Sequence, residues 1–385
     1  MSTRVDFTDV AVVDNHCHSV ERTQGQPDVA QWRALFTESP DQFMRTQAVT
    51  HTVFYQRLMT QMGLHYGTDA DEAAILQKRG QYDVIELTGR LFTDAGVGAL
   101  VVDTGYPDPS VALPVQALAA TGSYQAVQLL RLELVLQELI VRSSTYDELL
   151  DAVRDRLAGA RAKGFAGFKS IAAYRTGLAI ARWPKDAASA AFAEARQEVH
   201  ATGGVRLGHK PLLDSLLHVA FEVAAAEQLP VQFHVGYGDP DADLRNANPL
   251  LLRAVLEEAP YRGMSVVLLH SCWPFVREGA FLAAVYGNAF LDLSYGIPFL
   301  SRQEMRSMTR AALAAAPTNK LMYSSDGARV PELHWLGARD GRRLLGEVLG
   351  ELIDDGDLTQ KQARRAGEQV LRDNARAMYG LGDVS

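Results

Sequence analysis

Eight short apolar runs recur along most of the chain, and helix-like segments separate them. The runs are apolar on both faces, which is typical of strands buried inside a parallel sheet. This alternation predicts an α/β architecture with right-handed crossovers, and eight strands match a (β/α)8 TIM barrel. A doubly wound open sheet would show the same alternation and stays an alternative. The predicted strands are VAVVDNH, which ends near Asn15, and the runs at 97–105, 126–134, 164–171, 229–236, 264–271, 289–294 and 320–326.

One long segment, residues 19–95, interrupts this alternation. It is rich in helix-forming and aromatic residues and contains no convincing strand. Because it follows the first strand, it lies on the barrel face where active sites are built. We therefore predict a single barrel domain over residues 1–385, in which 19–95 is a helical insertion that walls the active site. A last helix is expected to begin near Arg339, to run toward Met378 and to close the barrel.

The composition, with 47% hydrophobic and 22% charged residues, is that of an ordinary globular protein. A net charge of -8 and the lack of a basic run argue against nucleic acid as a partner. The two cysteines, Cys17 and Cys272, are too few for a disulfide framework and favour reduced thiols. The sequence has no signal peptide pattern and no apolar stretch near the ~20 residues of a membrane span. We expect a soluble cytoplasmic protein that acts on a small molecule and has no membrane partner. Whether it forms a homo-oligomer is left open by the sequence.

Polar residues fall at the carboxyl ends of these apolar strands. His16 and His18 are two residues apart at the end of the first strand, so their side chains share one face and can grip one ion. Each of these residues also has a purely structural interpretation. A histidine can be a hydrogen-bonded core residue, a buried lysine can form half of an ion pair, and an aspartate can cap a helix. Their common position favours a metal centre, because strand ends converge on one mouth of a barrel. The later strand ends carry Lys169, His234, His270 and Asp326.

This pattern resembles the amidohydrolase superfamily, with His-x-His on strand one, Lys on four, His on five and six, and Asp on eight. Four blocks resemble more narrowly one branch, which includes the amidohydrolase-like N-terminal domain of nodulin/glutamine-synthetase fusion proteins and related stand-alone bacterial hydrolases. Unlike the fusion proteins, this chain is expected to lack a glutamine synthetase domain. The blocks are GFKSIAAYRTGL (167–178), QFHVGYGD (232–239), VVLLHSCWPF (266–275) and YSSDG (323–327).

Two imidazoles and a carboxylate suit Zn²⁺ or Mn²⁺. An ammonium cannot bind a cation, so the resemblance implies a carbamate on Lys169 that bridges two ions. The first ion would take His16, His18, Lys169 and Asp326, and the second would take Lys169, His234 and His270. An activated water would attack the carbonyl carbon, and Asp326 would carry its proton to the leaving amine. Alternatively, His16, His18, His234 and Asp326 hold one ion, His270 orients the water, and Lys169 binds substrate.

Substrate contacts are inferred from residues near the same strand ends. Arg131 and Glu133 are two residues apart and are expected to share the inward face of the third strand, and Arg175 follows Lys169 closely. Arginine side chains suit a carboxylate on the substrate, although each of them also fits a structural ion pair. Aromatic candidates for the pocket lining are Tyr174, Tyr237 and Trp273. Supporting residues behind the site are expected to be Asp14 and Asp239, which would orient imidazoles, and Glu133.

We therefore expect a metal-dependent amidohydrolase that cleaves an amide or related C–N bond of a small, carboxylate-bearing molecule. A metal-dependent decarboxylase, hydratase or sugar-acid isomerase of the same superfamily is an alternative, because fold does not decide among these reactions. Lys169 favours hydrolysis, since a decarboxylase with one ion has less need of a bridging ligand. A non-catalytic, metal-binding regulatory barrel is the alternative from another class.

Overall fold

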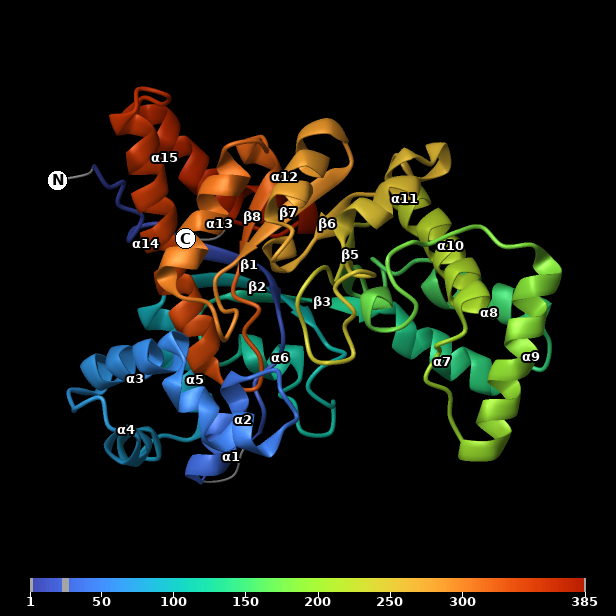
Figure 1. Ribbon diagram of the computed structural model, residues 1–385, viewed down its shortest axis with the longest axis horizontal. Helices are drawn as coiled ribbons and strands as arrows, with labels where there is room; N and C mark the ends of the chain where they lie inside the picture. The colour runs from blue at the N-terminus through green and yellow to red at the C-terminus, as the bar shows by residue number, and fades with distance from the viewer. Residues whose placement is uncertain (1–2, 23–27, 384–385) are drawn as a thin grey trace. The chain divides into compact units, whose positions relative to one another are not determined.

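The computed structural model describes residues 3–22 and 28–383, so residues 23–27 of the predicted insertion lie outside the described residues. Eight strands with helices between them form one sheet in the order β1 to β8 (Figure 1). The paired strands are parallel and β8 contacts β1, so the fold is the predicted (β/α)8 barrel. The strands are β1 (Val12–Cys17), β2 (Val97–Asp103), β3 (Gln125–Arg131), β4 (Phe165–Ser170), β5 (Val231–Phe233), β6 (Val266–Leu268), β7 (Ala289–Ser294) and β8 (Leu321–Ser324).

Three polar residues are register partners across β3, β4 and β5: Arg131, Lys169 and Gln232. Register partners of a parallel sheet point to the same face, so these side chains share one level of it. Lys169 and Gln232 are buried, at 1% and 0% exposure. Gly167 allows the close pairing of β4 with the chain before β5, because a Cβ there would lie 2.7 Å from the Pro230 carbonyl oxygen. The sheet therefore encloses a lysine beside a glutamine, which ordinary core packing disfavours.

Contacts divide the chain into two compact units. The first unit comprises 1–126, 238–240 and 292–385, and the second comprises 127–237 and 241–291. Helices of the first unit are α1 (Val29–Arg33), α2 (Gln42–Thr46), α3 (Val53–Tyr66), α4 (Glu72–Arg79), α5 (Val84–Asp94), α6 (Val115–Ala119), α13 (Arg302–Leu313), α14 (Pro331–Asp354), α15 (Gln360–Glu368) and α16 (Asn374–Tyr379). Helices of the second unit are α7 (Leu132–Arg142), α8 (Tyr146–Leu157), α9 (Lys185–Thr202), α10 (Lys210–Ala226), α11 (Arg253–Glu257) and α12 (Val276–Val285).

The insertion after β1 is helical over its described part and contributes α1 to α5 (Figure 1). Each of these helices begins at a residue whose side-chain oxygen accepts a backbone N–H of the first turn. Such caps satisfy donors that a helix leaves unpaired, which explains why short helices form here. The capping residues are Asp28, Asp41, Thr52, Asp71 and Asp83.

Buried ion pairs connect the insertion to α14, the helix that follows β8. Arg79 Nε lies 2.6 Å from Glu332 Oε1, with side-chain exposures of 7% and 0%. Arg57 Nε lies 3.2 Å from Asp340 Oδ2, and both of these side chains are buried as well. Because charges removed from water must be matched closely, the pairs fix the position of the insertion against α14.

Removal of one partner of such a pair is expected to destabilise the fold. Arg79→Ala leaves the Glu332 carboxylate buried without its cation, so the free energy of unfolding should fall by about 3–5 kcal/mol. Denaturant-induced unfolding followed by circular dichroism measures this change. Arg90→Ala is the matched control, because both side chains of the Arg90–Glu86 pair are exposed. Exposed pairs contribute at most ~1 kcal/mol to the free energy of unfolding. Equal losses in the two variants would contradict the role assigned to the buried pair.

The predicted last helix is wrong in its limits. We expected one helix from near Arg339 toward Met378, whereas α14 begins at Pro331 and ends at Asp354, and α15 and α16 follow it. Proline suits the first turn of a helix, which explains the earlier start. Gly356, with φ +82°, follows the end of α14, and a capping box at Thr359 starts α15.

The third strand also ends earlier than predicted. We expected it to run to residue 134, but β3 ends at Arg131 and Glu133 lies in the first turn of α7. The expected sharing of one strand face by Arg131 and Glu133 is therefore wrong. Leu132 and the residues after it have strong helix propensity, and apolar residues alone do not distinguish the end of a buried strand from the start of a buried helix.

Among the described residues, no helix is both long enough and apolar enough to span a bilayer. Cys17 and Cys272 are both buried free cysteines, as the cysteine count predicts.

Candidate metal centre

His16, His18 and Asp326 lie together in the first unit, where β1 and β8 end. His16 Nε2 and His18 Nε2 lie 3.5 and 3.8 Å from Asp326 Oδ1, and one donor atom from each residue lies within 4.8 Å of the others. The two imidazole rings meet edge to face, with their centroids 5.0 Å apart. Two nitrogens and one oxygen that converge in this way can hold one divalent ion and leave a coordination position open.

Backbone conformation aims Asp326 at the histidines. Asp326 has a positive φ of 52°, which is uncommon for a residue other than glycine, although aspartate tolerates it better than most. Its N–H donates to the His16 carbonyl oxygen at 3.1 Å. Asp14 accepts the N–H of Ser325 at 2.9 Å, and burial raises the pKa of the Asp14 carboxyl to about 7. Asp14 therefore holds the chain at the residue before Asp326; its predicted role in orienting an imidazole stays a prediction.

Two residues that the sequence interpretation missed support His18. Asp103, at the end of β2, places its carbonyl oxygen 3.2 Å from His18 Nδ1, so a proton on Nδ1 leaves Nε2 to face Asp326. His334, in the first turn of α14, lies 3.0 Å from the His18 carbonyl oxygen through Nε2. Burial lowers the pKa of His334 to about 4, so its ring is neutral and donates one hydrogen bond. Gly327 makes room for this ring, because a Cβ there would lie 2.5 Å from it.

His234 and His270 lie together in the second unit, with ring centroids 4.3 Å apart. Tyr174 packs 4.3 Å from the His234 ring, and Tyr237 packs 5.4 Å from the His270 ring. His234 Nε2 lies 2.6 Å from the Tyr237 carbonyl oxygen, so a neutral ring that donates there has Nδ1 as its acceptor. Lys169 is the penultimate residue of β4 in the same unit, directly before Ser170.

A left-handed turn carries His270. Three consecutive residues, His270, Ser271 and Cys272, have φ of 61°, 51° and 52°. Left-handed conformations cost roughly 1–2 kcal/mol for each residue other than glycine. Strain of this kind clusters at functional sites, and it persists only where the surrounding structure fixes the backbone. The role predicted for His270 stays a prediction.

Glu133 holds the end of β4 from α7. Its Oε1 accepts the Ser170 hydroxyl at 2.7 Å and the Ile171 N–H at 2.9 Å, and burial raises the pKa of its carboxyl. Because these donors directly follow Lys169, Glu133 fixes the position at which that lysine leaves the strand. Arg175 donates to the Tyr174 carbonyl oxygen at 3.3 Å, and burial lowers the pKa of Arg175.

The remaining predicted residues lie at chain turns. Trp273 precedes a cis bond to Pro274, and its carbonyl oxygen accepts the Tyr237 N–H at 2.8 Å. Asp239 is exposed and acts electrostatically on Glu38, a residue of the insertion. The roles predicted for Trp273 and Asp239 stay predictions.

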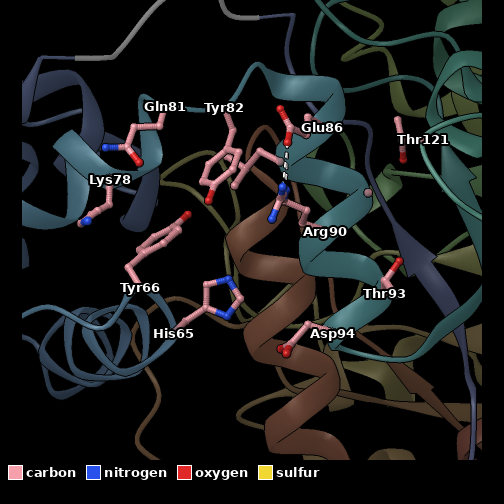
Figure 2. A pocket seen from close by; sticks show the side chains of 12 residues that line it. His65, Tyr66, Lys78, Gln81, Tyr82, Glu86, Arg90, Thr93, Asp94 and Thr121 are labelled. Atoms are coloured by element: carbon pink, nitrogen blue, oxygen red, sulfur yellow. Dashed lines mark hydrogen bonds and ion pairs between the residues drawn. The ribbon is translucent and has the colours of Figure 1, made fainter.

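A separate hollow of about 790 Å³ lies in the first unit, and none of the predicted site residues lines it. Figure 2 shows its walls, which come from the end of α3, from α4 and from one face of α5. Arg90 pairs with Glu86 there and covers the Tyr82 ring at 4.5 Å. The hollow is lined by charged residues of both signs that are largely exposed. These residues therefore serve as control positions for experiments on the metal centre.

Comparison with known proteins identifies the family. Residues 149–381 match the model of the family described as Amidohydrolase. The protein fluG of Emericella nidulans is 35% identical over 227 residues, which are 56% of this chain but only 26% of that protein. A candidate metal-dependent hydrolase from Lactobacillus casei is 26% identical, with 98% of each chain covered and a TM-score of 0.87. Uronate isomerase from Thermotoga maritima shares the fold at 12% identity, with 96% of this chain and 95% of that chain covered and a TM-score of 0.68. This chain belongs to the amidohydrolase family.

Proposed function

We propose that this protein is a metal-dependent hydrolase that cleaves an amide or related C–N bond of a small molecule. The observation that carries the proposal is the convergence of His16, His18 and Asp326 within 4.8 Å at the ends of β1 and β8. Membership of the amidohydrolase family supports it. The donor set fits a divalent ion, since imidazole nitrogen and carboxylate oxygen suit Zn²⁺ and Mn²⁺ alike.

A divalent ion at these residues would acidify a water molecule and polarise a carbonyl group. His16 and His18 would fix the reaction centre, because the backbone of both is hydrogen-bonded to the segment after β8 and the His18 ring also contacts the Asp103 carbonyl oxygen. Asp326 would accept the proton of the attacking water and deliver it to the leaving amine. A carboxylate has two oxygens that can take up a proton, and Oδ1 is the one that faces the imidazoles.

The second part of the proposal extends the centre to Lys169, His234 and His270. It rests on strand order, since the carboxyl ends of all strands of a TIM barrel open on one face. A carbamate on Lys169 would then bridge two ions, whereas His234 would join His16, His18 and Asp326 in an arrangement with one ion. Metal analysis combined with intact mass spectrometry distinguishes them. Two equivalents of metal with added mass on Lys169 support the bridge, and one equivalent with unmodified lysine supports the single ion.

Substrate screening tests the reaction itself. Metal-loaded protein should hydrolyse at least one member of a panel of dipeptides, N-acyl amino acids and other carboxylate-bearing amides. Arg131 and Arg175 are the residues proposed to bind the carboxylate. Because the fold is shared with uronate isomerases, uronates form the comparison arm of the screen. Turnover of uronates without turnover of any amide would contradict the hydrolase proposal.

Chelation is expected to remove this activity. Dialysis against EDTA should lower amide turnover by at least the ~10²-fold that a catalytic group contributes, and added Zn²⁺ or Mn²⁺ should restore it. Circular dichroism before and after chelation is the control, because it shows whether the fold survives the removal of metal. Turnover that survives complete removal of metal, verified by elemental analysis, would contradict the metal-dependent mechanism.

A further inference from the structure

The end of β7 carries two polar side chains that lie outside the predicted metal site, Asp292 and Ser294. They are two residues apart in the run AFLDLS, so they share one face of the strand. Both residues are fully buried, at 0% exposure. Because a carboxylate removed from water needs hydrogen-bond donors, Asp292 depends on the residues around it.

Ser324, the last residue of β8, supplies one of these donors. Its hydroxyl donates to Asp292 Oδ2 at 2.6 Å, whereas the Ser294 hydroxyl lies 3.1 Å from the same oxygen. The two hydroxyl oxygens are 2.6 Å apart, and Ser324 is as deeply buried as its two partners. Hydrogen bonds from a hydroxyl to a carboxylate are among the short and strong ones in proteins. The Asp292–Ser324 bond therefore fastens the end of β8 to β7.

The backbone after β7 holds the same segment. The Tyr295 N–H donates to the Ser324 carbonyl oxygen at 3.0 Å. Gly296 passes directly against the next residue, because a Cβ there would overlap the Ser325 carbonyl oxygen. The end of β7 and the two residues that follow it thus contact Ser324 and Ser325 through side chain and backbone.

Asp326 follows these two residues in a conformation that needs support. Its φ of 52° is uncommon outside glycine, and such a conformation persists only where the surrounding structure fixes it. On the side of β1, the His16 carbonyl oxygen accepts the Asp326 N–H, and Asp14 accepts the Ser325 N–H. On the side of β7, the bonds of Ser324 hold the chain two residues before Asp326. The direction of the Asp326 carboxylate therefore depends on both neighbouring strands.

We propose that Asp292 is a positioning residue, which orients Asp326 through the Ser324 hydroxyl. The inference rests on the proposed function, because Asp326 is the ligand and the proton carrier of that mechanism. A ligand that is poorly oriented binds its ion more weakly, and loss of an outer partner typically costs ~10–100-fold in metal affinity or activity. Metal affinity thus reports on the role of Asp292 without any turnover.

The experiment uses a matched pair of serines. Ser324→Ala and Ser294→Ala each remove one fully buried hydroxyl that contacts Asp292 Oδ2, so both should lower the free energy of unfolding to a similar degree. Of the two, Ser324 leads directly to Asp326 in the chain. Competition against a chromophoric chelator gives the metal affinity of each variant, and denaturant-induced unfolding gives its stability.

We expect Ser324→Ala to lose ~10–100-fold in metal affinity and Ser294→Ala to keep the affinity of wild type. Asp292→Asn keeps the shape of the side chain but weakens the acceptor, so its metal affinity should fall by a similar factor. In the double variant Asp292→Asn/Ser324→Ala the two losses should not add, because both changes break the same bond.

Equal metal affinities in the two serine variants, or additive losses in the double variant, would overturn the proposal. If Ser324→Ala does not fold, Asp292→Asn decides alone, because a folded Asp292→Asn protein with the metal affinity of wild type also overturns it.

Amide turnover by wild type separates this inference from the proposed function. Weaker metal binding by Ser324→Ala, without hydrolysis of any amide by wild type, would reject the hydrolase and keep the positioning role. Hydrolysis by wild type, with undiminished metal affinity in Ser324→Ala and Asp292→Asn, would keep the hydrolase and reject the positioning role.

Discussion

Replacement of Asp326 by asparagine is expected to lower kcat for amide hydrolysis by about 10²–10⁴-fold, the range that a positioned general base contributes. Asparagine keeps the shape of the side chain and one oxygen toward the imidazoles, but it cannot accept a proton near neutral pH. The substitution also suits the backbone, because asparagine tolerates the positive φ of this position as aspartate does. Steady-state kinetics with metal-loaded protein measures the effect.

Asp83→Asn is the matched control for that prediction. Asp83 caps α5 by accepting the Glu86 N–H at 2.8 Å, and asparagine caps a helix about as well. Its kcat should equal that of wild type. Metal content must be determined for both variants, since Asp326 is also a proposed ligand. Full turnover by an Asp326→Asn protein that retains its metal would show that Asp326 does not carry the proton.

The barrel and the convergence of His16, His18 and Asp326 could be predicted because simple periodicities encode them. His16 and His18 share a strand face by the period of two, and Asp326 follows an apolar run that ends at the same edge of the sheet. The same rule would have found Asp103, which ends β2 and contacts His18. Asp103 stands outside the His-x-His, Lys, His, His and Asp pattern, although a carboxylate behind an imidazole is a regular companion of a ligand.

Other parts of the site have no local signal. His334 supports His18 from a helix turn that the sequence interpretation placed outside the last helix. The left-handed turn at His270 uses no glycine, so the residues themselves give no sign of it. Glu133 was assigned to the wrong element because strand and helix boundaries carry the least information.

Loss of His18 is expected to have the largest effect on metal binding. His18→Gln removes the nitrogen that faces Asp326, so metal affinity should fall by more than the ~10–100-fold that loss of an outer partner costs. The loss for Asp103→Asn should fall within that smaller range, since the substitution removes the carboxylate charge 3.9 Å from His18 Nδ1 but keeps the backbone carbonyl oxygen that contacts the same nitrogen. Competition against a chromophoric chelator measures both affinities on one scale.

His65→Gln provides the reference for this series, because His65 is exposed in the hollow of Figure 2 and contacts the Trp335 ring. Its metal affinity should equal that of wild type. The order His18, then Asp103, then His65 follows from the proposed roles of these residues, because His18 would be a ligand, Asp103 would orient it, and His65 lies outside the site. If His18→Gln bound metal as tightly as His65→Gln, the pairing of His16 with His18 on one strand face would have to be attributed to packing, and the ion would have to be sought among His234, His270 and their neighbours.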